Sequence, residues 1–221
     1  MATAKPRLSD RDVAVLAALV RFGALRTDQV ARRFFPSTRA ARERLARLVA
    51  AEQVRRGPLD TFTATERGTR SSGVDLTPPN VWPGQLVHQL AVVDLAGWLL
   101  DHEPGSEWVT ERELRREAAQ LARAAGGGHR FPGTDHMPDG LLVTPARRIA
   151  IELELTAKPR SEYDRICRWY AQAIEFDAVR WYVRGRALED RIRMFVERHD
   201  LADCMSVEQL PEAVRIVRWT A

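Results

Sequence analysis

Residues 138–156 read PDGLLVTPARRIAIELELT, and this stretch decides the predicted fold. Residues 141–143 form a short apolar run, and residues 144–147 have the composition of a turn. From residue 149 to residue 155, apolar and polar side chains alternate with a period of two, which is the pattern of a half-buried β-strand. The stretch therefore predicts a β-hairpin.

The predicted hairpin brings three carboxylates together. Centring the turn between residues 145 and 146 places residues whose numbers sum to 291 opposite each other, and Asp139 and Glu152 satisfy that sum. Directly opposed side chains have Cβ atoms roughly 4.5–5.5 Å apart. Glu154 shares a face with Glu152, because side chains alternate along a strand. We therefore expect a crowded acidic face.

Two explanations of this acidic face stay open. Like charges at such distances repel unless a cation or protons intervene, and Mg²⁺ prefers oxygen ligands, so Asp139 and Glu152 are candidate ligands for Mg²⁺ or Mn²⁺. Alternatively, the hairpin simply exposes a polar face to water. A transition-metal set of His129, His136 and Asp139 is less favoured, because histidines on a glycine-rich loop are more often uncoordinated.

The composition is that of a folded chain of one or two domains, with 221 residues. No apolar run reaches the roughly 18 residues of a membrane span. Met1 to Pro6 leads directly into a helix start, so we expect no signal peptide. Cys167 and Cys204 have neither disulfide nor zinc spacing, which favours reduced thiols in a cytoplasmic protein.

The charge is distributed unevenly along the chain. Residues 1–75 contain 15 Lys and Arg against 8 Asp and Glu, whereas the remainder contains 19 against 22. The N-terminal third is therefore the basic part, which indicates a polyanionic partner for it.

Three short helices and a hairpin are predicted in the N-terminal domain, residues 1–66. Ser9 caps the first helix, with Asp12 in a capping box, and the later helices cover about 28–35 and 38–51. Strands at 53–56 and 61–64 follow. This order is that of a winged helix-turn-helix.

A winged helix-turn-helix normally places its third helix in the major groove of double-stranded DNA, with the wing near the backbone. The alternatives are a solvated arginine face or a winged helix that binds protein. The candidate DNA-binding residues lie on the third helix and the wing: Thr38, Arg39, Arg42, Glu43, Arg47, Arg55 and Arg56.

A linker at residues 67–84, rich in glycine and proline, separates this domain from a second one at residues 85–221. Helices are predicted at 85–102, 111–123, 161–176 and 188–199. Strands are predicted near 108–110, in the hairpin, at 179–183 and at 214–217. The predicted class is α+β, with a mixed sheet in the second domain.

The acidic hairpin resembles the core of the PD-(D/E)xK nuclease superfamily, which has a restriction-endonuclease-like αβββαβ fold. The resemblance rests on Pro138-Asp139 and Glu152-Leu153-Glu154. It implies that Asp139 and Glu152 ligate Mg²⁺ and that a metal-activated water hydrolyses a phosphodiester bond. Glu154 stands where the superfamily usually has lysine, and Lys158 is the candidate to supply the amine. The resemblance leaves open whether the chain is a metal-dependent endodeoxyribonuclease.

The whole chain is also similar to the replication-relaxation family of actinobacterial plasmids and integrative elements, through stretches at 8–12, 110–115, 136–140 and 151–158. This resemblance implies a DNA-binding accessory protein of plasmid replication or mobilisation. The implied partners are double-stranded DNA and a relaxase or replication proteins. We expect a second copy of the chain as a partner because winged-helix proteins commonly read paired half-sites, and no membrane because no apolar run is long enough to span one. The alternative is a non-enzymatic winged-helix transcriptional regulator whose second domain dimerises.

Overall fold

The computed structural model describes residues 8–124 and 136–217. These residues divide into two compact units. The first contains the chain up to residue 94 and from residue 215 onward, and the second contains residues 95–214. The predicted domains at 1–66 and 85–221 remain predictions.

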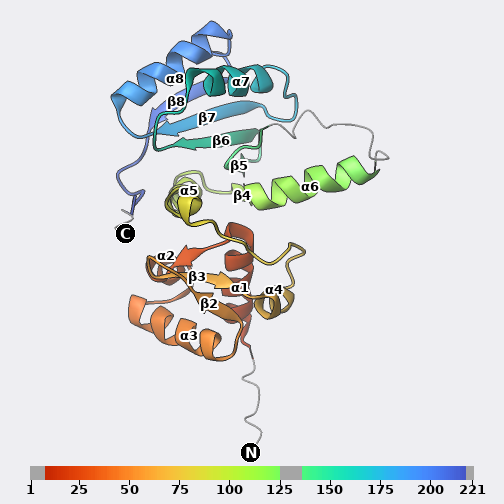
Figure 1. Ribbon diagram of the computed structural model, residues 1–221, viewed down its shortest axis with the longest axis vertical. Coiled ribbons are helices and arrows are strands. Elements are labelled where there is room, and N and C mark those ends of the chain that lie inside the picture. The colour runs from red at the N-terminus through yellow and green to blue at the C-terminus, as the bar shows by residue number, and fades with distance from the viewer. Residues whose placement is uncertain (1–7, 125–135, 218–221) are drawn as a thin grey trace, which may run out of the picture. The chain divides into compact units, whose positions relative to one another are not determined.

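The first unit combines short helices with a small antiparallel sheet (Figure 1). Strand β3 lies between β1 and β2 and pairs antiparallel with both. Leu16, Leu19 and Leu45 are fully buried between the helices and this sheet. In chain order, the described elements of this unit are α1 (Asp10–Phe22), β1 (Leu25–Arg26), α2 (Thr27–Phe34), α3 (Thr38–Ala50), β2 (Val54–Arg56), β3 (Thr61–Ala64), α4 (Glu66–Ser72) and the first part of α5 (Pro83–His102).

The predicted start of the first helix is confirmed. Ser9 is the N-cap of α1 and forms a capping box with Asp12: the Asp12 amide donates to Ser9 Oγ at 3.3 Å, and the Ser9 amide donates to Asp12 Oδ2 at 2.7 Å. Arg44 on α3 adds a hydrogen bond from Nε to Asp12 Oδ1 at 2.6 Å. Burial alone would raise the pKa of Asp12, but the hydrogen bonds from Arg44 and Ser9 outweigh it and lower this pKa to about 2.

The replacement Asp12→Asn is expected to lower the free energy of unfolding by about 2 kcal/mol at pH 7. The lowered pKa in the folded state means that this stability is present above the ordinary value of 3.8 and is lost as the pH falls toward 2. Denaturant unfolding at pH 7 and pH 3 measures it, and roughly half of the difference should remain at pH 3. The control is Asp10→Asn in the same helical turn, which is exposed. An equal loss at both pH values would contradict the assigned pKa.

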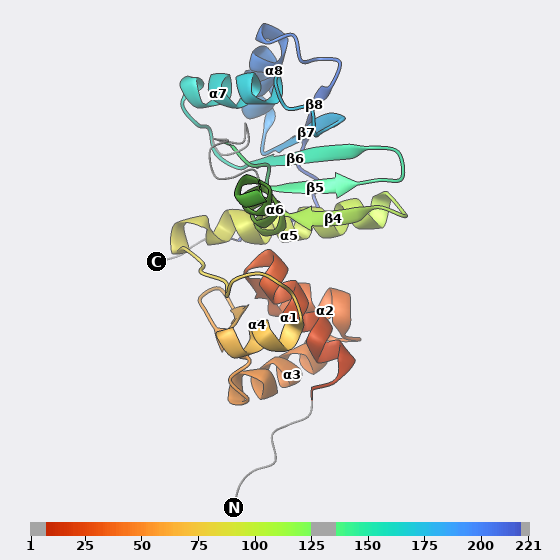
Figure 2. The ribbon, with the colours of Figure 1, turned by 90° about the vertical axis from the view of Figure 1, so that its right-hand side faces the viewer.

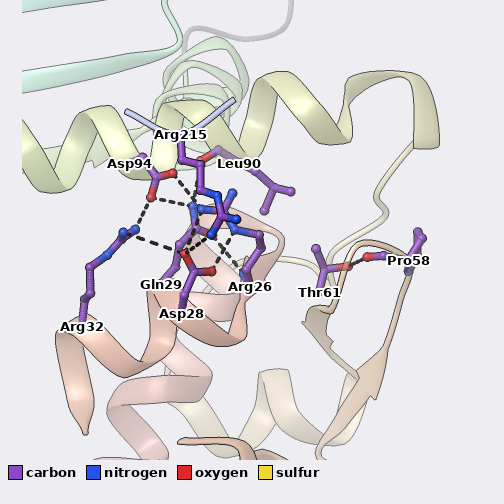
Figure 3. A network of polar contacts seen from close by, with 9 residues as sticks. All are labelled: Arg26, Asp28, Gln29, Arg32, Pro58, Thr61, Leu90, Asp94 and Arg215. Atoms are coloured by element: carbon purple, nitrogen blue, oxygen red, sulfur yellow. Dashed lines mark hydrogen bonds and ion pairs between the residues drawn. The ribbon is translucent and has the colours of Figure 1, made fainter. Parts of the chain in front are cut away.

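A buried polar network holds the first part of α5 against α2 (Figure 3). Asp94 accepts from Arg26 Nη2 at 2.8 Å and from Gln29 Nε2 at 2.9 Å, and Arg32 Nη2 also donates to it. Gln29 Nε2 donates to the Leu90 carbonyl at 2.8 Å as well. The side chains of Arg26 and Asp94 are 5% and 1% exposed, so this is a fully desolvated ion pair.

Two elements of the first unit were not predicted. Strand β1 pairs with β3 through Leu25 opposite Phe62, and its two residues are too few to give a periodic signal. Residues 66–72 form α4, although the composition of residues 67–84 predicts a linker. Thr65 caps α4 by accepting from the Gly68 amide at 3.1 Å. Gly68 is buried against the Gln53 carbonyl, where an added Cβ atom would clash at 2.0 Å. Close packing on the first unit therefore makes this segment helical.

The second unit is a mixed sheet with helices, and its strands run in the order β4-β5-β6-β7-β8 (Figure 2). β4, β5 and β6 pair antiparallel, whereas β6, β7 and β8 pair parallel. The elements described in this unit are the remainder of α5, β4 (Glu107–Thr110), α6 (Glu111–Ala124), β5 (Gly140–Val143), β6 (Arg148–Glu154), α7 (Arg160–Tyr170), β7 (Ala178–Val183), α8 (Arg186–Arg198) and β8 (Met205–Gln209).

The predicted hairpin and its register are confirmed. Gly140 lies opposite Ile151 and Leu142 lies opposite Ile149, so paired residue numbers sum to 291. Gly140 is required at its position because the Trp108 ring covers it, and an added Cβ atom would lie 2.0 Å from Trp108 Cζ2.

The face of the sheet that carries the even-numbered residues of β6 is covered by α7 and α8 (Figure 1). Ala150 of β6 belongs to the core cluster on this face, together with Trp181 of β7, which lies beside Glu152 in the parallel register. Tyr163 and Phe195 bring the two helices into the same cluster. The face predicted to be polar is therefore a buried interior, and the explanation that it is exposed to water is wrong.

The predicted fold class is wrong. The chain does not follow the plan of a winged helix-turn-helix followed by a restriction-endonuclease-like αβββαβ domain. Helix α6, which was predicted at 111–123, separates β4 from β5, so these strands do not follow one another directly as in the αβββαβ plan. In the described residues, two parallel β-α-β crossovers complete a mixed five-stranded sheet. The last strand is Met205–Gln209 and not residues 214–217, because Met205 and Val207 fill the sheet beside β7.

None of the helices within residues 8–124 and 136–217 combines the length and the apolar character that a membrane span requires.

Candidate acid–base site

Glu152 is a carboxylate held in the interior of the second unit. Its residue is 3% exposed, as is Glu154 two positions along β6. A buried carboxylate is costly unless hydrogen bonds or charges compensate it, so its partners define what the site can do.

Two side chains converge on one oxygen of Glu152. Tyr170, near the end of α7, donates its hydroxyl to Oε1. His136 places Nε2 at 2.6 Å from the same oxygen. The rings of His136 and Tyr170 meet edge to face, with centroids 5.5 Å apart. Among the described residues, the other ring nitrogen of His136, Nδ1, has no hydrogen-bond partner.

Tyr170 remains a hydrogen-bond donor throughout the ordinary pH range. Its burial and the negative charge of Glu152 raise the pKa of the phenol well above its usual value. The hydroxyl therefore keeps its proton and fixes the orientation of the carboxylate.

Asp139 completes the end of the hairpin. Asp139 lies one residue before Gly140, where β5 begins, and so stands next to the end of the β5–β6 pairing. Asp139 Oδ2 accepts from the Leu153 amide at 2.8 Å and takes the place of a backbone acceptor. The motif Pro138-Asp139-Gly140 therefore has a structural role, because the Asp139 side chain holds the end of β6 next to the first residue of β5.

Lys158 forms an ion pair with Glu154 at the end of β6, with Nζ 2.9 Å from Oε2. Burial lowers the pKa of Lys158, but the hydrogen bond and charge of Glu154, with Glu152 and Asp139 nearby, outweigh burial and raise it. The Lys158 amide donates to the Tyr163 hydroxyl at 2.9 Å, which fixes the loop that carries the lysine. The ammonium is therefore a permanent positive charge beside the buried carboxylates.

The predicted Mg²⁺ or Mn²⁺ site at Asp139 and Glu152 is wrong. The described residues contain no group of three or more His, Cys, Asp or Glu side chains arranged to hold a metal ion. The physical reason is that each acid is bonded within the protein: Asp139 to the Leu153 amide, Glu152 to Tyr170 and His136, and Glu154 to Lys158. His129, from the alternative metal set, lies outside the described residues.

The predicted catalytic residues and the predicted DNA-binding residues lie in different units. Asp139, Glu152, Glu154 and Lys158 gather at one end of β6. In the first unit, the five candidates on α3 and the two on β2 are exposed. Arg39 pairs with Glu43 at 2.9 Å, and Arg56 pairs with Asp60 at 2.7 Å.

Sequence reasoning missed the roles of His136 and Tyr170. His136 stands three residues before Asp139, so its place beside the hairpin was a usable signal. Tyr170 is 18 residues from Glu152 and reaches it only because α7 crosses the sheet. A tyrosine near the end of an amphipathic helix has no feature in the sequence that separates it from an ordinary core residue.

No protein-family model matches the chain, and no curated protein matches it. Among solved structures, the chain is similar to a riboflavin-derivative dimethyltransferase, RosA, from Streptomyces davawensis, with 13% identity, a TM-score of 0.25, and coverage of 90% of this chain and 62% of that one. The chain is also similar to an O-methyltransferase from neocarzinostatin biosynthesis, NcsB1, in complex with S-adenosyl-L-homocysteine. The identity is 11%, the TM-score is 0.24, and the match covers 90% of this chain and 64% of that one. For an O-methyltransferase family protein from Burkholderia thailandensis, the identity is 13%, the TM-score is 0.22, and the match covers 90% of this chain and 60% of that one. The chain spans less than two thirds of each of these proteins.

These findings overturn the predicted family and function. No protein-family model matches, so none supports the replication-relaxation family, and the solved structures named above are methyltransferases and not nucleases or replication proteins. The predictions of a DNA-binding accessory protein with a nuclease-like domain, and of a winged-helix transcriptional regulator, are corrected accordingly. At these TM-scores the matches assign neither their fold nor their activity to this chain. The predicted partners, namely double-stranded DNA, a second copy of the chain, and a relaxase or replication proteins, stay predictions.

Proposed function

We propose that the second unit carries a hydrolytic site in which His136 is the general base. The observation that carries this proposal is the contact of 2.6 Å between His136 Nε2 and the buried carboxylate of Glu152. A carboxylate that binds the proton on Nε2 selects the tautomer in which Nδ1 carries a lone pair. His136 is 11% exposed in its side chain, so a small molecule or water has access to an edge of the ring.

In the proposed reaction an O–H bond of water breaks, and its proton passes to Nδ1 of His136. The water oxygen bonds to the carbonyl carbon of an ester, and the carbonyl electron pair moves onto its oxygen. Glu152 stabilises the imidazolium that forms. When the ester C–O bond breaks, the imidazolium returns the proton to the leaving oxygen. The products are a carboxylic acid and an alcohol, and His136 is again neutral.

The remaining predicted residues have supporting roles in this proposal. Lys158 offsets the negative charge that develops on the carbonyl oxygen, because its raised pKa keeps it charged. Glu154 holds Lys158, and Asp139 holds the end of β6 through the Leu153 amide. Tyr170 is a positioning residue, because it touches Glu152 and not the reacting atoms.

A second histidine–carboxylate pair in the same unit shows why His136 is the better candidate. His199 Nε2 lies 3.0 Å from Asp164 Oδ1. The Asp164 side chain is 33% exposed and also has Arg198 at 3.6 Å, so water and a cation compete for its charge. Only the Glu152 pair couples a desolvated carboxylate to the ring, and desolvation strengthens the electrostatic effect on the imidazolium.

The test is the hydrolysis of 4-nitrophenyl acetate by wild type, His136→Gln, Glu152→Gln and the matched control His199→Gln. Loss of a general base should lower kcat/KM by about 10²-fold or more in His136→Gln, with a smaller loss in Glu152→Gln. His199→Gln should keep the wild-type rate. A wild-type rate no greater than that of buffer overturns the proposal, as does an equal rate in wild type and His136→Gln.

We also propose the cytoplasm as the site of this activity. Cys167 and Cys204 are both free, with Cys167 buried, which is in keeping with a reducing compartment.

A further inference from the structure

An aromatic cluster lies directly beside the proposed base. The His136 ring meets the Trp169 ring edge to face, with centroids 5.2 Å apart and an interplanar angle of 74°. Trp169 meets Tyr170 in the same way at 4.8 Å, and Phe176 follows at 6.0 Å from Trp169. The four rings form a continuous cluster that begins at His136 and extends past the end of α7.

This cluster is only partly covered by the protein. Tyr170 is 6% exposed, but Trp169 and Phe176 are only half-buried at the edge of the core. Ile174, in the segment that joins α7 to β7 and includes Phe176, is 98% exposed. Apolar and aromatic surface next to a few polar groups is the usual composition of a small-molecule site.

The two arginines of α7 near this cluster, Arg165 and Arg168, bond to other residues of the same helix. Arg165 Nη2 bonds to Glu162 Oε1 at 2.6 Å, and Arg168 Nε donates to the Asp164 carbonyl at 3.2 Å. Both guanidinium groups are therefore engaged along α7 itself. The rings of His136, Trp169 and Phe176 supply the apolar part of this surface. Charged groups lie close by, since Glu162 is paired with Arg165 and the charge of Glu175 acts on Tyr170.

We infer that Trp169, with Phe176 and Ile174, binds an apolar, planar part of the substrate next to His136. This inference rests on the proposed function, because it names the substrate class of the same site: esters that carry an aromatic group. The planar group packs against the indole ring, and the scissile carbonyl then lies within reach of a water at Nδ1 of His136. Offset or edge-to-face packing of aromatic rings favours such a ligand over an aliphatic one of the same size.

The binding arm of the test uses 2-naphthol, which has no scissile bond, and titration calorimetry of the full chain. Wild type should bind it, and Trp169→Ala should bind it roughly ten-fold more weakly. Ile174→Ser is the second variant, because an exposed side chain can be replaced without disturbing the core, and it should weaken binding by a smaller factor. Trp82→Ala is the matched control, since Trp82 is an exposed indole of the first unit at 66%.

The kinetic arm compares 4-nitrophenyl benzoate with 4-nitrophenyl acetate, which share a leaving group. Because both esters carry an aromatic ring, Trp169→Ala should raise KM for both of them with little change in kcat, and the rise should be larger for the benzoate, whose acyl part adds a second ring. Equal binding of 2-naphthol by wild type and both site variants overturns the inference. If 2-naphthol binding depends on Trp169 but neither ester is hydrolysed, the aromatic site is supported and the proposed hydrolytic function fails.

Discussion

Replacing Asp94 with alanine is expected to lower the free energy of unfolding of the first unit by about 3–5 kcal/mol. Asp94 is 1% exposed in its side chain and accepts hydrogen bonds from Arg26, Gln29 and Arg32. The variant leaves the guanidinium of Arg26 buried without its main partner on α5, although Asp28 still holds Nε at 2.9 Å. An uncompensated buried charge costs more than the ion pair contributed, and this imbalance makes the expected effect large.

Denaturant unfolding and amide hydrogen exchange in α2 measure this loss. The matched control is Arg32→Ala, which removes another member of the same network. Its side chain is 54% exposed, so water replaces the lost contact and the cost should stay below about 1 kcal/mol. If Asp94→Ala were no more destabilising than Arg32→Ala, the network would not be the link that holds α5 to α2.

Replacing Phe195 with alanine is expected to cost the second unit about 3–5 kcal/mol. Phe195 on α8 is fully buried, and its ring lies 5.6 Å from that of Tyr163 on α7. Truncation removes the transfer free energy of the ring and leaves a cavity between the two helices and the sheet. Because α7 also carries Tyr170, we expect the hydrogen bond that orients Glu152 to weaken in the same variant.

Thermal or denaturant unfolding gives the magnitude, and Glu197→Ala, an exposed residue of the same helix, is the control that should change little. A cost below about 1 kcal/mol in Phe195→Ala would mean that the core under α7 and α8 is not close-packed.

The local elements of this chain follow from its sequence because their signals are local. The capping box of Ser9 and Asp12 places the start of α1 through contacts three residues apart. The alternation from residue 149 and the turn at 144–147 set the hairpin register, since a shift of one residue would move every apolar side chain to the opposite face.

The environment of the carboxylates on that hairpin was decided by tertiary structure alone. The sequence shows Glu152 and Glu154 on a common face but not that α7 and α8 bury it, because that burial depends on two parallel crossovers far along the chain. Because these carboxylates are buried, their partners are the side chains of Tyr170, His136 and Lys158 and not water or a metal ion. A buried charge takes its character from whichever groups the fold brings within hydrogen-bond distance, and no local pattern specifies them.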